Sequence, residues 1–91
     1  MYKDLSEIKR HINLGTTYKK AEITVGQDAF CVAFVLPGGG EQVIATQKRG
    51  SKRRSPRVFK NLITTYNFIR KTGFNGEVTI LEDPTGRLLK P

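Results

Sequence analysis

The 91-residue chain carries 16 Lys and Arg residues against 8 Asp and Glu residues, a formal net charge of +8. A chain of this length forms one domain, so residues 1–91 are expected to fold as a single unit with a small core. Its hydrophobic content of 37% excludes a disordered chain. With one His and one Cys it lacks the ligands of the usual zinc sites, and its apolar segments are too short to span a bilayer. We expect no metal, no cofactor, no membrane contact and a cytoplasmic location.

A short amphipathic helix is predicted from Asp4 to Asn13. Asp4 and Glu7 have the three-residue spacing of a capping box. Apolar residues recur at helical spacing, at Leu5, Ile8 and Ile12. Gly15 is placed to end the helix, and His11 is expected on its solvent-exposed face.

Three strands are predicted next, over residues 20–25, 29–36 and 41–48. The first alternates apolar and polar residues, and its tight connection to the second predicts antiparallel pairing. The second is apolar on both faces, which is typical of a central strand, and Cys31 within it is expected to be a buried small hydrophobe. Residues 37–40, Pro-Gly-Gly-Gly, predict a hairpin tip and lack the spacing of a phosphate-binding P-loop.

A main helix is predicted over 56–72, with Ser55 as N-cap and Pro56 at the first helical position. Its expected buried stripe is Phe59, Leu62, Ile63, Tyr66 and Ile69. Phe68 is expected on the opposite, wet face. A fourth strand over 77–82 completes an α+β fold: a short N-terminal helix, a three-stranded antiparallel sheet with the main helix packed on it, and a C-terminal fourth strand.

A basic segment, residues 48–57, precedes this helix. Its six cations leave only +2 of the formal +8 for the rest of the chain, so the basicity is local and indicates a polyanion partner. Arg and Lys side chains bind phosphates, and the amides of a helix N-terminus at Ser55–Arg57 would act on the same anion. The candidate binding residues are Lys48, Arg49, Lys52, Arg53, Arg54 and Arg57, followed by Lys60, Asn61 and Lys71.

Other interpretations of the basic segment stay open. A solvated surface loop and a nuclear-import signal both have this composition. The segment could also dock on an acidic protein, as in a protein-interaction module or a small inhibitor that occupies a nucleic-acid channel. An enzyme is not expected, because Glu82 and Asp83 would point to opposite faces of a strand and Cys31 lacks a local activating group.

Two family resemblances are carried by short motifs. Residues 50–54, Gly-Ser-Lys-Arg-Arg, opening a helix after three strands, resemble the last helix of double-stranded-RNA-binding domains, but Pro56, the tight first hairpin and the fourth strand depart from that family. Residues 47–50, 57–62 and 68–74 are similar to a pattern in small accessory proteins of bacterial plasmids and mobile elements, in which a strand ending in Arg-Gly leads to a short helix. The second resemblance implies DNA binding in plasmid maintenance or its regulation.

The sequence thus predicts a non-catalytic nucleic-acid-binding protein with a regulatory or architectural role, with duplex DNA favoured over RNA. A homodimer is also expected. The strand over 29–36 is apolar on both faces, the main helix covers one of them, and Phe68 adds exposed apolar surface. The interface is expected to include the sheet or the helix over 56–72.

Overall fold

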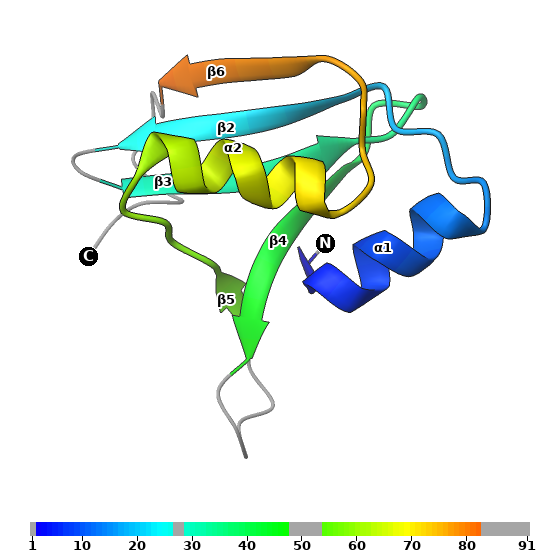
Figure 1. Ribbon diagram of the computed structural model, residues 1–91, viewed down its shortest axis with the longest axis horizontal. Coiled ribbons are helices and arrows are strands. Elements are labelled where there is room, and N and C mark those ends of the chain that lie inside the picture. Colours follow the sequence, from blue (N-terminus) through cyan, green and yellow to red (C-terminus); the bar gives the residue numbers. More distant parts are fainter. Residues whose placement is uncertain (1, 27–28, 48–53, 83–91) are drawn as a thin grey trace.

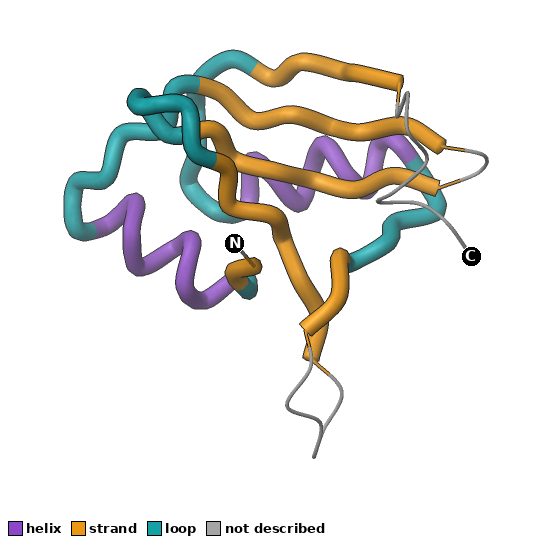
Figure 2. Tube along the Cα trace, turned by 180° about the vertical axis from the view of Figure 1, so that it is seen from behind, coloured by secondary structure: helices purple, strands orange, loops and turns teal. Residues whose placement is uncertain are grey.

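The computed structural model describes residues 2–26, 29–47 and 54–82. It shows a mixed β-sheet with two helices on one face, so the predicted α+β class is confirmed (Figures 1 and 2). The strand order is β1-β4-β3-β2-β6, and β5 pairs with β4 off this path. The elements are β1 Tyr2–Lys3, α1 Leu5–Asn13, β2 Lys20–Gly26, β3 Ala29–Val35, β4 Glu41–Gln47, β5 Arg54–Pro56, α2 Leu62–Lys71 and β6 Val78–Glu82.

The middle of the sheet is the predicted antiparallel unit. β3 lies between β2 and β4 and pairs antiparallel with both, as expected for the strand that is apolar on both faces. The turn between β3 and β4 is closed by hydrogen bonds from Leu36 N to Gly40 O (2.7 Å) and from Gly39 N to Leu36 O (2.9 Å). Gly39 has φ +98°, a conformation that favours glycine, which explains the glycine-rich hairpin tip.

The outer strands correct the predicted sheet. β6 pairs parallel with β2 and β1 pairs parallel with β4, so the sheet is mixed and has more strands than the three antiparallel ones expected. A period-two pattern marks a strand but does not encode its neighbour or direction, and a two-residue strand such as β1 is too short to show the pattern at all.

The first helix forms as its sequence predicts. Asp4 Oδ1 accepts from Glu7 N (2.8 Å), and Asp4 N donates to Glu7 Oε1 (3.2 Å), which completes the capping box. Gly15, with φ +96°, follows the C-cap. Ile8 is fully buried in the core, and this contact fixes α1 on the helical face of the sheet.

The second helix begins later than predicted. Residues 54–56 form strand β5 on the edge of β4, with Pro56 opposite Ala45, and Arg57 N donates to Ile44 O (2.9 Å). Proline has no N–H and is tolerated on an edge strand, while the residue before it disfavours the helical conformation. The helix therefore starts at Leu62, where the side chain of Asn61 is the N-cap and accepts from Thr64 N (3.0 Å).

The buried face of α2 agrees with the prediction at Ile69 and differs from it elsewhere. The residues that face the core are Thr65, Phe68, Ile69 and Thr72, whereas Leu62, Ile63 and Tyr66 are exposed. Phe68 is only 8% exposed, so its expected place on the wet face was wrong. The two threonines can be buried because their hydroxyls donate to helix carbonyls, Thr65 to Asn61 O (2.7 Å) and Thr72 to Ile69 O (2.6 Å). Phe59 is buried as predicted, but it lies before the helix, where its backbone pairs with Phe30.

A polar chain joins α1 to the sheet through Tyr18. Its hydroxyl donates to Gln42 Oε1 (2.6 Å) and lies 3.2 Å from His11 Nδ1. His11 is therefore half-buried and hydrogen-bonded rather than simply solvent-exposed. The Tyr18 ring packs on Phe34 with centroids 5.1 Å apart, and burial raises the pKa of its phenol.

Cys31 is 1% exposed, which confirms the predicted burial. We expect a thiol reagent such as DTNB to react with native protein only as fast as the chain unfolds. The reason is that the Cys31 side chain is buried in the folded protein and the reagent cannot reach it. The reaction should become rapid in denaturant. A stoichiometric reaction within the mixing time of native protein would contradict the burial of this strand face.

Candidate nucleic-acid interface

The basic segment is presented by the strand pair β4–β5. Gln47 lies opposite Arg54, so the described chain leaves the sheet after β4 and returns to the same place at β5. Four of the candidate residues, Lys48, Arg49, Lys52 and Arg53, fall between these points and lie outside the described residues. Figure 1 shows the paired ends of β4 and β5 extending away from β2 and β3. The described part of the basic segment, from Arg54 to Arg57, therefore lies on and just after the strand pair.

Arg57 is held at the base of this strand pair by two aromatic rings. Its Cζ atom lies 4.9 Å from the ring centroid of Phe59 and 5.0 Å from that of Phe68. These rings pack on each other with centroids 4.9 Å apart and are buried in the core. The cation–π contacts fix the guanidinium over a rigid apolar support, while Arg57 as a whole stays exposed. An ordered Arg fork of this kind suits bidentate contact with a phosphate.

A shallow hollow of about 240 Å³ lies beside this guanidinium. Its floor is formed by Phe59 and Phe68, and its rim is polar or cationic. The rim residues are Arg57, Thr64, Asn67 and Lys71. Two cations with hydroxyl and amide donors, and no carboxylate among the described lining residues, suit a phosphate or sugar edge.

Sequence reasoning found only part of this hollow. Arg57 and Lys71 were predicted, but Thr64 and Asn67 were not. Thr64, Asn67 and Lys71 follow one another at helical i, i+3, i+7 spacing, so the signal was present. Thr64 and Asn67 were not among the candidates because Phe68 was expected to be exposed on this face, whereas it is buried and forms the floor of the hollow.

Two other candidates have different positions. Lys60 is exposed just before α2. Asn61 uses its side-chain oxygen to cap the helix, so its first role is structural. The helix amides expected at Ser55–Arg57 are not there, because that stretch is a strand and the helix N-terminus lies at Asn61–Leu62.

The ion pairs of the described residues lie away from the hollow. In the described ranges, the ion pairs join Lys3 to Glu7 (3.6 Å) on β1 and α1 and Lys20 to Glu22 (3.3 Å) on β2. These carboxylates do not neutralise Arg57 or Lys71. Among the described residues, no three His, Cys, Asp or Glu side chains are grouped to hold a metal ion. The described helices are also too short or too polar to cross a membrane.

Comparison of the chain with protein-family models, with curated proteins and with solved structures found no match.

Proposed function

We propose that this protein binds nucleic acid, with duplex DNA preferred over RNA, through the basic segment 48–57 and the hollow beside Arg57. The observation that carries the proposal is the clustering of these cations. Six basic residues and no acid lie in the chain between the end of β4 and the residue after β5, and Arg57 is anchored there on two buried rings. Positive charge that is concentrated in one part of the chain and held by packed aromatic rings is typical of a polyanion-binding site.

The preference for duplex DNA is supported by the shape of this end. β4 and β5 form a two-stranded antiparallel ribbon that extends from the sheet (Figure 1). The major groove of B-DNA is about 12 Å wide and admits a two-stranded ribbon, whereas the deep major groove of A-form RNA does not. The ribbon would lie in the groove, and Arg57 and Lys71 would contact the flanking phosphates.

A regulatory or architectural role in a bacterial plasmid or mobile element is the corresponding biological proposal. It rests on the resemblance of residues 47–50, 57–62 and 68–74 to accessory proteins of such elements. The proposed action is non-catalytic: cations bind phosphates and the ribbon positions the protein on the duplex.

Mobility-shift titrations test the proposed function. The protein should shift a duplex DNA, and shift an RNA duplex of equal length only at higher concentration. Binding should weaken steeply as salt rises, because phosphate contacts release counterions. If neither nucleic acid is shifted at low salt, the proposal is wrong, and the alternative of a basic segment that docks on an acidic protein takes its place.

Arg53 and Arg54 give a quantitative test of the segment. Arg53→Ala/Arg54→Ala should weaken binding to all duplex sequences about equally and lower the slope of log K against log salt by ~0.9 for each phosphate that is no longer neutralised. The matched control is Arg10→Ala/Lys19→Ala, which removes the same charge from exposed positions on α1 and before β2. An equal decrease of slope in both variants would show that only net charge matters and would contradict a localised site.

A further inference from the structure

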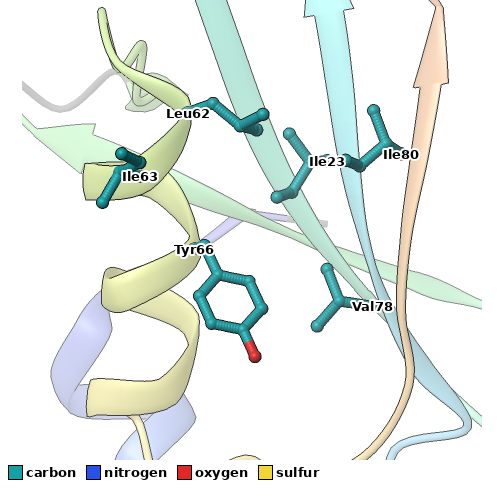
Figure 3. A pocket seen from close by; sticks show the side chains of 6 residues that line it. All are labelled: Ile23, Leu62, Ile63, Tyr66, Val78 and Ile80. Atoms are coloured by element: carbon teal, nitrogen blue, oxygen red, sulfur yellow. The ribbon is translucent and has the colours of Figure 1, made fainter.

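A second hollow, apolar and separate from the basic one, lies on the other side of α2. It has a volume of about 310 Å³ and opens between the helix and the β2–β6 half of the sheet (Figure 3). Its lining is entirely hydrophobic or aromatic. The lining residues are Ile23, Leu62, Ile63, Tyr66, Val78 and Ile80.

The helix side of this hollow is a second apolar surface of α2. α2 buries Phe68 and Ile69 in the core of the protein, and its remaining apolar residues are exposed. Ile63 is 71% exposed, and Leu62 and Tyr66 flank it. A helix that is apolar on two sides is typical of one packed between two partners.

The sheet side of the hollow has room for one helix. α2 packs on β3, and the strand order places β2 and then β6 beyond it. Two strand spacings give about 9.6 Å between β3 and β6, which matches the 8–10 Å between packed helices. Ile80 on β6 is 55% exposed and points to this face beside the buried Ile23. A helix laid over β2 and β6 would therefore touch both α2 and the strands.

We propose that the occupant is a second copy of this chain, with α2 of each copy seated in the apolar hollow of the other. The surface is self-complementary, because the ridge formed by Leu62, Ile63 and Tyr66 stands directly beside a groove of helix width. A two-fold axis parallel to the helices, between α2 and the groove, exchanges the ridge of one copy with the groove of the other. Such an isologous contact closes at a dimer.

Charge at the start of β6 favours the same arrangement. Figure 3 shows Leu62 at the level of Ile80 and Tyr66 at the level of Val78, so α2 runs antiparallel to β6. The two-fold axis keeps the partner helix in that direction. The basic last turn of the partner helix, which contains Arg70, then lies toward the start of β6, where Glu77 precedes the strand. The basic last turn of the incoming helix therefore approaches the acidic start of the strand. Arg70 is held by the Phe74 and Gly76 carbonyls of its own chain (3.1 and 3.0 Å), so it contributes charge at this end and not a new ion pair.

Sedimentation equilibrium of the full chain tests this interface and does not depend on the proposed function. The native protein at micromolar concentration should give twice the 10.2 kDa chain mass. Ile63→Glu and Ile80→Glu should each raise the dimer dissociation constant ~30-fold or more, the effect of a central interface residue. Both side chains are mostly exposed within one copy, so neither change should unfold the chain, which circular dichroism checks.

Leu14→Glu is the matched control, because Leu14 is 78% exposed but lies at the C-cap of α1, away from the hollow. It should leave the dissociation constant unchanged. A native protein that stays at the single-chain mass up to ~100 µM overturns the proposal and leaves the hollow to a different occupant. A dimer that persists with its native dissociation constant in both Ile63→Glu and Ile80→Glu also overturns it, because the interface must then lie elsewhere.

Discussion

Phe68→Ala is expected to lower the free energy of unfolding by about 3–5 kcal/mol, the range for a large aromatic removed from a packed core. Phe68 is 8% exposed and contacts Phe59 in the core cluster. The substitution removes this ring pairing and leaves a cavity beneath Arg57, whose guanidinium lies over the same ring. Urea denaturation followed by circular dichroism measures the decrease in stability.

Ile63→Ala is the control on the same helix, measured at a concentration low enough to keep the chain monomeric. Ile63 is large and apolar but 71% exposed, so its removal should cost less than about 1 kcal/mol. The two variants also separate the two possible buried faces of α2. If Ile63→Ala were the more damaging change under these conditions, the helix would present the face that its hydrophobic spacing suggests, and the observed packing would be wrong.

Salt should have the largest effect on the proposed binding. If the six cations of residues 48–57 each neutralise one phosphate, raising the salt concentration from 50 to 200 mM should weaken binding to duplex DNA ~10³-fold. The reason is the entropy of released counterions, which scales with the number of neutralised phosphates. Fluorescence anisotropy of a labelled duplex, titrated at four or more salt concentrations, gives the slope.

The slope also distinguishes the ways in which the protein could bind. A value near −5.4 corresponds to about six phosphates at ~0.9 each. A slope of less than about half this magnitude would show that most cations of the segment do not contact phosphate, even if binding were detected. Sedimentation under the same salt conditions provides the control, because dissociation of a dimer would also weaken binding as salt rises.

Local signals predicted much of this fold. The capping box of α1, the alternating β2, the doubly apolar β3 and the glycine hairpin at residues 36–40 all form where the sequence places them. Each of these features depends on residues close in sequence, so local reasoning suffices. The parallel pairings of β1 with β4 and of β6 with β2 join residues that are far apart in the chain. No local sequence pattern predicts them.

The second helix shows why the remaining features were not predicted. Ser55-Pro56 is typical of a helix start. In the structure these residues instead form strand β5, which pairs with β4. Counting hydrophobic residues selected Leu62, Ile63 and Tyr66 as the inner face. The real inner face contains Thr65 and Thr72, which count as polar but bond their hydroxyls to the helix itself. The same error left Thr64 and Asn67 out of the predicted binding residues. Arg57 and Lys71 were predicted, and both are exposed at the basic hollow.

The mixed pairing of the sheet predicts an order of folding. β2, β3 and β4 are neighbours in sequence and can pair early as hairpins, with little loop entropy to lose. Both parallel strands, β1 and β6, join partners far away along the chain, so each must wait until its partner is in place. β6 also waits for α2, which precedes it. β6, the strand that carries Ile80 in the apolar hollow, is thus expected to join the sheet last. Until it does, the edge of β2 has no partner strand, and an unpaired edge is where two folding chains can associate.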